Sequence, residues 1–386
     1  MQKKVYIFMF IDALGWEIVN KYNFMEEKLP HRYPAKMQFG YSCTAIPTIL
    51  TGQNPQGHKH LSFYYYDEEN SPFKIFKLLK FLPSQIFDRW RVRHILSKLI
   101  KKAKGYTGYF ELYAMPFERL QYFDYIEKTD LFVPGGLAPV ANIADELVAR
   151  DIKYHISNWR LSEKENIASL VDDLQKGEIE FAFLYTAAMD GLLHRVTKDG
   201  KEIPEKLDFY EKEIAKVWQM AQEKYADFEF YVISDHGMTT LIDEIDLKKP
   251  IEALPYKFGK DYVAVYDSTM ARFWFHQPQA KAAICKILEE QPHGKILSDD
   301  ELQEHGVYFE DAMYGELIYL LDPGYQIAPS DMGINALPGM HGYHPEDKDS
   351  IASFLGTAEV KDPPRWVGDY FRVMRQKMDE IVAKRP

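Results

Sequence analysis

The chain has 386 residues, of which 46% are hydrophobic and 27% charged, and its formal net charge is −11. This composition excludes a disordered chain and a coiled coil, and the length predicts one large domain that carries insertions. The negative charge argues against binding of a nucleic-acid polymer. The two cysteines, Cys43 and Cys285, are too few for a disulfide framework or a thiolate zinc site, so a bound metal would need His, Asp or Glu ligands.

The first apolar run covers residues 5–11 and stops at Asp12, so it predicts a buried strand and not a secretory signal. No stretch of the chain approaches the roughly 18 apolar residues that a membrane-spanning helix requires. Together with the low cysteine content, these features predict a cytoplasmic protein whose contact with a membrane is, at most, peripheral.

Apolar runs without alternation are interspersed with amphipathic segments along the chain, a pattern typical of parallel strands covered by helices on both faces. The expected strands span residues 5–11, 152–156, 180–186 and 228–234, and the expected helices residues 44–50, 142–149, 205–223 and 366–383. Further strands at 262–266, 272–275 and 317–321 and a helix at 279–290 indicate a smaller α/β segment. The predicted fold class is an α/β three-layer sandwich with a mostly parallel central sheet.

This pattern divides the chain into a core and two insertions. The core comprises residues 1–66, 136–250 and 336–386, the cap residues 67–135, and the smaller α/β insertion residues 251–335. Within the cap, residues 74–104 hold ten Lys or Arg against one acid, which leaves the remainder of the chain near −20. Such a segment is typical of helices that touch anionic lipid or cover a negatively charged substrate, and the alternative is an ordinary solvated insertion.

Carboxylates stand where three of the expected strands end, beside histidines. Because the carboxyl ends of parallel strands share one edge of a sheet, we expect these side chains to converge, although a single acid there is more often a helix cap or turn residue. The six candidate metal ligands are Asp12, Asp190, His194, Asp235, His236 and His341. His344 is the rival of His341. Three carboxylates and three imidazoles suffice for two divalent cations with open coordination positions, as displacement at phosphorus requires.

Ser42, at the start of an expected helix, is the candidate nucleophile. Backbone N–H groups and the helix dipole favour an anion at that position, and a bound cation would lower the pKa of the hydroxyl further. The alternative is that Ser42 only caps the helix.

Several motifs occur in the order found in one family. Asp12 ends the first strand, Ser42 stands nine residues before Thr51-Gly52, Asp190 and His194 are four apart, Ser-Asp-His-Gly-Met occupies 234–238, and His-Gly-Tyr occupies 341–343. In this order the chain resembles the alkaline phosphatase superfamily, in particular its type I phosphodiesterase and nucleotide pyrophosphatase branch. The resemblance runs through nearly all of the chain apart from the cap.

The resemblance implies a role for each matching residue. One metal would be bound by Asp12, Asp235 and His236 together with Ser42, and the other by Asp190, His194 and His341. The resemblance implies that both ions are Zn²⁺, as is usual in this branch, with Mn²⁺ as the alternative. Ser42 would form a phosphoseryl intermediate that water then hydrolyses.

The chain departs from the family pattern at two places. Phe63 stands where nucleotide-hydrolysing members have an Asn that binds a phosphoryl oxygen, which argues against nucleotide substrates. Pro47 follows Ser42 by five residues and not two, so Thr44 is a reserve nucleophile. The sulfatase and phosphoglycerate mutase motifs are absent, so neither activity is expected.

We therefore expect a two-metal hydrolase of phosphate esters that favours diesters. The alternatives are a phosphomonoesterase, a phosphoryl-group transferase, or a catalytically silent protein that binds a phosphate ligand. Phe63 and Tyr64 are the candidate substrate contacts, although Tyr64 could equally pack in the base of the cap. The expected substrate is a small-molecule or lipid-linked phosphate ester, with residues 74–104 as the contact to an anionic membrane. The sequence leaves the oligomeric state open.

Overall fold

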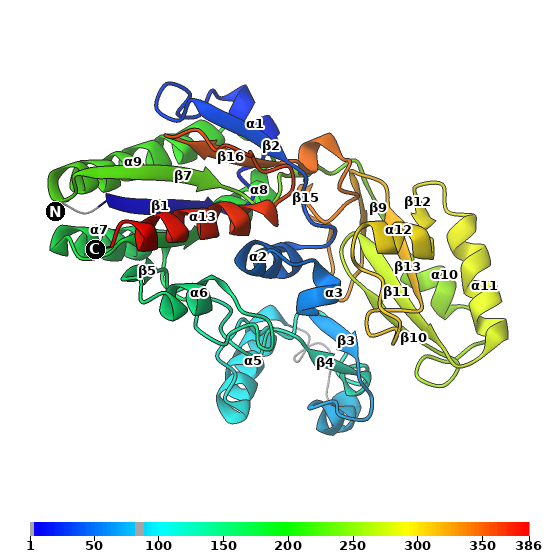
Figure 1. Cartoon of the computed structure of the whole chain (residues 1–386). Coiled ribbons are helices and arrows are strands. Elements are labelled where there is room, and N and C mark those ends of the chain that lie inside the picture. Colours follow the sequence, from blue (N-terminus) through cyan, green and yellow to red (C-terminus); the bar gives the residue numbers. More distant parts are fainter. Residues whose placement is uncertain (1–3, 82–88, 386) are drawn as a thin grey trace.

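The computed structural model describes residues 4–81 and 89–385 and is built around a six-stranded sheet of order β2-β16-β7-β1-β6-β5 (Figure 1). The parallel strands are β7 (Asp227–Ile233), β1 (Lys4–Ile11), β6 (Phe181–Thr186) and β5 (Tyr154–Ile156). An antiparallel edge that the sequence analysis did not foresee is formed by β16 (Ala352–Gly356) and β2 (His31–Ala35). The predicted fold class is confirmed, with a mixed sheet.

Helices cover both faces of this sheet, because the sheet is apolar on both sides. From Val5 to Ile11 the odd-numbered residues of β1 belong to one buried cluster and the even-numbered residues to the other. The first face is covered by α1 (Trp16–Lys21), α7 (Glu163–Lys176), α8 (Ala188–Val196) and α9 (Ile203–Lys224). The second is covered by α2 (Ser42–Thr51), α6 (Ile143–Ala149) and α13 (Asp369–Ala383).

Local signals in the sequence set the ends of these helices. Ser162 and Glu165 form a reciprocal capping box at the start of α7. Gly52 adopts a left-handed conformation after α2, with φ of 69°, which ends that helix. The expected strands and helices of the core are therefore present with bounds that differ from prediction by a few residues.

The cap joins the core through a two-stranded ribbon of β3 (Tyr64–Tyr66) and β4 (Phe123–Tyr125). It contains the 3₁₀ helices η1 (Lys74–Phe81) and η2 (Leu120–Tyr122) and the α-helix α5 (Trp90–Lys104). The helices expected over residues 74–104 are thus a 3₁₀ helix and an α-helix. Residues 82–88, which this prediction also covered, lie outside the described residues. In the described part of the chain, no helix has the length and apolar character needed to cross a membrane.

The smaller α/β segment has its own sheet of order β10-β11-β13-β12. Its strands are β10 (Tyr262–Tyr266), β11 (Met270–Phe275), β13 (Leu317–Leu321) and β12 (Gly294–Ile296), and its helices are α10 (Lys248–Glu252), α11 (Pro278–Glu289) and α12 (Asp299–Glu304). The remaining elements are α3 (Pro55–His58), η3 (Lys348–Ser350) and the strand pairs β8 (Thr239–Thr240) with β15 (Gly339–Met340) and β9 (Asp243–Ile245) with β14 (Tyr325–Ile327).

A buried ion pair connects this smaller segment to the residues that lead from the core into the cap. Arg272, fully buried on β11, donates from Nε to Asp267 Oδ2 at 2.8 Å and from Nη2 to Ser62 Oγ at 2.9 Å. Its Nη1 donates to the carbonyl of Tyr64 at 2.8 Å. Because Ser62 and Tyr64 lead into the cap, one guanidinium fixes the positions of both insertions.

Arg272→Met is expected to destabilise the protein by about 3–5 kcal/mol, because it leaves the Asp267 carboxylate buried without its cation. The measurement is the midpoint of urea unfolding. Lys212→Ala, which removes an exposed pair with Asp208, is the control and should cost no more than about 0.5 kcal/mol. Equal midpoints for the two variants would contradict this assignment.

Candidate metal centre

Three carboxylates stand at the carboxyl ends of three neighbouring strands. Asp12 directly follows β1, Asp235 follows β7 after one residue, and Asp190 lies in the first turn of α8, which follows β6. Since β7, β1 and β6 are adjacent and parallel, their ends meet at one edge of the sheet. The structure therefore brings together the three acids that the sequence analysis singled out.

The first cluster consists of Asp12, Asp235 and His236, whose ligand atoms all lie within 4.8 Å of one another. His236 Nε2 is 3.2 Å from Asp235 Oδ2 and 3.7 Å from Asp12 Oδ1. His236 Nδ1 donates to the carbonyl of Gly237 at 2.8 Å, which fixes the ring and directs Nε2 toward the carboxylates of the cluster.

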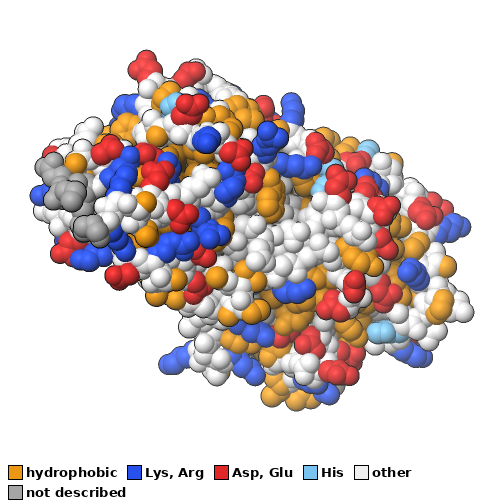
Figure 2. Space-filling model, in the orientation of Figure 1, with side chains coloured by type: hydrophobic (Ala, Val, Ile, Leu, Met, Phe, Trp, Pro, Cys, Tyr) orange, Lys and Arg blue, Asp and Glu red, His pale blue; other side chains and the backbone are white. Residues whose placement is uncertain are grey.

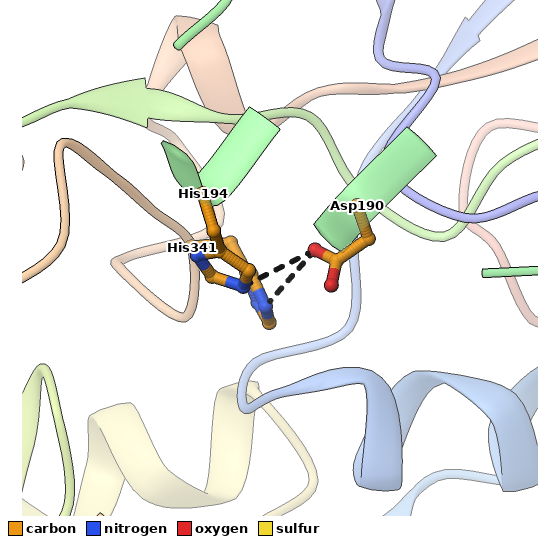
Figure 3. A group of neighbouring side chains, drawn as sticks. All are labelled: Asp190, His194 and His341. Atoms are coloured by element: carbon orange, nitrogen blue, oxygen red, sulfur yellow. Dashed lines mark ion pairs between the residues drawn. The ribbon is translucent and has the colours of Figure 1, made fainter. Parts of the chain in front are cut away.

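The second cluster consists of Asp190, His194 and His341 (Figure 3). Asp190 Oδ1 lies 3.3 Å from His194 Nε2 and 3.6 Å from His341 Nε2. Asp190 and His194 are one turn apart on α8, as their spacing predicted. His194 Nδ1 donates to the carbonyl of Gly339 at 2.8 Å, so here too the Nε2 atom faces the cluster.

The two clusters are neighbours, because the rings of His236 and His341 stack with centroids 3.8 Å apart. Burial raises the pKa of Asp12 well above its usual value, and the charges of Asp235 and Asp190 add to this effect. Burial alone would lower the pKa of His236, but the three carboxylates outweigh it and raise that pKa to about 10. The site therefore favours positive charge between the carboxylates.

Within the described residues, several buried polar atoms of the site have no hydrogen-bond partner. They are Asp12 Oδ1, Asp190 Oδ1, Asp235 Oδ2 and His341 Nδ1. Buried carboxylate oxygens without donors are costly unless a cation satisfies them. Carboxylates and imidazoles in sets of three are also the ligands that catalytic zinc sites use, so the residues fit two divalent cations.

Ser42 is the first residue of α2, and its hydroxyl reaches the first cluster, with Oγ 3.1 Å from His236 Nε2. The alternative that Ser42 caps the helix is wrong, because the N-cap is Tyr41. The Thr44 side chain accepts a hydrogen bond from the Tyr41 N–H and donates to the carbonyl of Leu61 at 2.6 Å. The structure thus places the reserve nucleophile Thr44 in a capping interaction and not at the site.

A cavity of ≈ 480 Å³ opens beside Ser42 and both clusters. Phe63 lines it, as expected of a substrate contact. Tyr64 does not, which corrects that expectation: it is fully buried in the base of the cap, and its hydroxyl donates to the carbonyl of Leu112 at 3.1 Å. His344, the rival of His341 as a ligand, does not line the cavity: its Nε2 atom lies 3.2 Å from the Nε2 atom of His305.

Sequence reasoning missed several residues of the cavity wall, among them Tyr185 and Glu127. Tyr185, near the end of β6, donates from its hydroxyl to Asp12 Oδ2 at 2.9 Å, and its place at a strand end was the available signal. Glu127, in the cap, lines the cavity, and nothing in the local sequence distinguished it.

Gly237 is required at this site by close packing. A Cβ atom at this position would lie 2.1 Å from the carbonyl oxygen of Asp349. The absence of a side chain lets the loop with Asp235 and His236 lie against η3, which precedes β16.

The fold and the two acid–histidine clusters define an α/β protein of the alkaline-phosphatase type. The model of the type I phosphodiesterase / nucleotide pyrophosphatase family matches residues 33–344. The chain therefore belongs to this family and is a phosphoric ester hydrolase. No curated protein sequence matches it.

Solved structures of ectonucleotide pyrophosphatase / phosphodiesterase 5 are similar to the chain over 98% of its length and 95% of theirs. The mouse protein has a TM-score of 0.68 at 14% identity, and the human protein 0.68 at 12%. An inactive variant of the mouse protein in complex with AMP has a TM-score of 0.67 at 15% identity. At these identities the likeness establishes the fold alone.

Removal of divalent metal by a chelator is expected to lower the Tm of the protein by at least about 5 °C, because cations bound to the folded state stabilise it by mass action. The measurement is thermal unfolding with and without added Zn²⁺. Asp12→Ala, which removes one proposed ligand, should reduce the shift. A Tm that chelation leaves unchanged, in protein shown to contain metal beforehand, would contradict the proposed centre.

Proposed function

We propose that the protein is a metal-dependent phosphodiesterase that acts through Ser42. The observation that carries this proposal is the position of the Ser42 hydroxyl, which lies at the start of a helix and within 3.1 Å of a buried cluster of carboxylates and histidines. A protein that merely binds a phosphate would not need a hydroxyl beside two candidate metal sites.

The first cluster would hold one divalent cation and the second cluster the other, and Zn²⁺ suits the carboxylate and imidazole ligands, with Mn²⁺ as the alternative. Once bound, such a pair lowers the pKa of a nearby hydroxyl and neutralises charge on the phosphoryl oxygens. Neighbouring groups orient the side chains of both clusters. The carbonyl of Gly237 orients His236 and that of Gly339 orients His194, and the hydroxyl of Tyr185 orients Asp12.

Two displacements would complete the reaction. In the first, Ser42 Oγ attacks phosphorus, the bond to the leaving alcohol oxygen breaks with its electron pair on that oxygen, and the Ser42 proton passes to solvent. The position of Ser42 at the start of α2, where the helix dipole is positive, would favour the negative charge that develops. In the second, water attacks the phosphoseryl group, the monoester leaves, and Ser42 regains a proton.

The cavity favours a diester over a monoester. Aromatic side chains of the cap and core line it beyond the clusters, among them Phe63, Tyr109 and Trp159. A phosphomonoester whose alcohol portion is small would leave this apolar space unused, whereas the second ester group of a diester can fill it. A phosphoryl-group transferase would use the same space for an acceptor alcohol.

The outward face of α5 supports a further proposal, that the cap contacts an anionic membrane from the cytoplasm. Ile95 and Leu99 are 58% and 59% exposed, and Lys98 and Lys102 lie beside them on the same face. Figure 2 shows apolar side chains beside basic and acidic ones at the lower edge of the molecule, where the cap lies in Figure 1. Apolar residues among lysines are typical of helices that bind the negative cytoplasmic leaflet, where a lipid-linked phosphate ester would be reached. The two free cysteines agree with a reducing compartment.

Ser42→Ala is expected to lower kcat on bis-p-nitrophenyl phosphate at least about 10³-fold while metal binding persists, because it removes only the nucleophile. Thr44→Ala is the control, since its hydroxyl only caps α2, and it should retain activity. Activity in Ser42→Ala together with inactivity of folded Thr44→Ala would overturn the assignment. Faster release from p-nitrophenyl phosphate than from the diester would favour a monoesterase instead.

Binding to vesicles is expected to depend on α5. The double variant Lys98→Glu/Lys102→Glu should bind vesicles of phosphatidylcholine and phosphatidylserine at least about tenfold more weakly than the wild type, since each basic residue near the surface contributes about 1 kcal/mol. Co-sedimentation measures this. Lys212→Glu/Lys216→Glu, on α9, changes the charge equally and should bind as the wild type does. Equal binding by both variants would contradict the proposed contact.

A further inference from the structure

The hairpin loop between β10 and β11 brings the smaller insertion to the candidate metal centre. Its three residues are Asp267, Ser268 and Thr269, and the first two line the cavity beside Ser42. Thr269 is fully buried, so its hydroxyl needs hydrogen-bond partners inside the protein. Those partners come from the two segments of the core that carry the candidate nucleophile and a candidate metal ligand.

Two hydrogen bonds join Thr269 to the neighbours of Ser42 and His341 in the chain. The Thr269 hydroxyl donates to the carbonyl of Gly342, which follows His341, at 2.6 Å. The hydroxyl of Tyr41, which precedes Ser42, lies 2.8 Å from Thr269 Oγ1. Because the single hydroxyl proton of Thr269 is used on the carbonyl, the Tyr41 hydroxyl is the donor in this second bond. The donors therefore run in one direction, from Tyr41 through Thr269 to the backbone after His341.

The Tyr41 hydroxyl is held from both sides in this arrangement. Its oxygen accepts a hydrogen bond from the Thr269 N–H at 3.0 Å, in addition to the one that it donates. Burial raises the pKa of Tyr41 above its usual value, so the hydroxyl keeps the proton that it donates. The position of Tyr41, and with it the start of α2, is thus set by Thr269.

Close packing leaves the segments around Tyr41 and Gly342 little freedom to shift. A Cβ atom at Gly342 would lie 2.4 Å from Tyr41 Cε1 and 3.1 Å from Thr269 Oγ1. Gly342 also has φ of 89°, which favours glycine. The rings of Tyr41 and His341 meet edge to face, with centroids 5.9 Å apart. A displacement of Tyr41 would therefore move Ser42 and His341 relative to one another.

The hairpin loop is itself fixed by the smaller insertion. The Leu321 N–H donates to the carbonyl of Thr269 at 2.9 Å. Asp267 accepts a hydrogen bond of 2.8 Å from Arg272 Nε in the buried ion pair. Because these contacts lie within residues 251–335, the insertion presents the Thr269 hydroxyl to the core from a rigid base.

We propose that Thr269 is a positioning residue, which sets the separation between the Ser42 hydroxyl and the second cluster. It acts on Ser42 through Tyr41 and on His341 through the carbonyl of Gly342. This inference rests on the proposed function and extends it, because it gives the smaller insertion a part in the reaction. A nucleophile that is misplaced by about 1 Å can lose about 10²-fold in rate, so a buried hydrogen bond that fixes its position matters for turnover.

Thr269→Val tests the proposal, because valine keeps the branched shape of the side chain and lacks the hydroxyl. We expect kcat on bis-p-nitrophenyl phosphate to fall about tenfold or more while KM changes by less than about twofold, since the cavity wall stays in place. Thr269→Ser, which keeps the hydroxyl, should retain kcat to within about threefold. Folded Thr269→Val with the kcat of the wild type would overturn the proposal.

Thr51→Val is the matched control. Thr51 is buried at the other end of α2, and its hydroxyl donates to the carbonyl of Pro47 at 2.7 Å, so its loss removes a hydrogen bond of the same kind. This variant should lower the Tm about as much as Thr269→Val does, yet its kcat should equal that of the wild type. Equal losses of kcat in the two variants would contradict a specific role for Thr269.

A double-mutant cycle tests whether Tyr41 and Thr269 act as one unit. Tyr41→Phe removes the other hydroxyl and should lower kcat about as much as Thr269→Val does. The double variant should be no slower than the slower single variant, because both substitutions break the same connection. Losses of kcat that multiply in the double variant would contradict the connection.

Metal binding separates the failure of this inference from the failure of the proposed function. Because Gly342 follows His341, Thr269→Val should bind one Zn²⁺ about tenfold or more weakly than the wild type and the other Zn²⁺ equally, as measured by titration against a competing chelator. That result in a protein without hydrolytic activity would sustain the positioning role and reject the phosphodiesterase. Hydrolysis by the wild type, with unchanged kcat and Zn²⁺ binding in Thr269→Val, would reject the positioning role alone.

Discussion

The burial of three carboxylates at the ends of three adjacent parallel strands is the constraint on which the rest of the site depends. Parallel strands place Asp12, Asp190 and Asp235 at one edge of the sheet, where burial and the charges of the other two acids raise the pKa of Asp12. Such a cluster is stable only if positive charge is bound among the acids. The two imidazoles held by backbone carbonyls, His194 and His236, are oriented to share that charge with them.

The core and the two insertions contribute different parts of the site. The core contains the two acid–histidine clusters and Ser42, whereas the cap and the smaller segment form much of the rest of the cavity wall. Arg272 joins the two insertions by binding Asp267, Ser62 and the backbone of Tyr64 in one buried network. Substrate selection can therefore change in the cap while the reacting geometry stays with the sheet.

The core and the convergence of its three acids could be predicted because apolar runs identify buried strands, and acids at the ends of adjacent parallel strands meet at one edge of the sheet. The pairing of β16 with β2 could not be predicted, because nothing in the local sequence of either segment indicates which strand it pairs with. The prediction of Tyr64 as a substrate contact was wrong, because the sequence of three successive tyrosines does not indicate which of them faces the cavity. Glu127 was missed because only the packing of the cap against the core shows that its side chain is buried in the wall of the cavity.

The central claim, that the two clusters each hold a divalent cation, is tested most directly by counting metal. Elemental analysis of protein purified without chelator and dialysed against Zn²⁺ should give about two ions per chain, and His194→Ala should give about one, because only the second cluster loses a ligand. A count of zero in the folded wild type, or an unchanged count when ligands are removed from both clusters, would contradict the account.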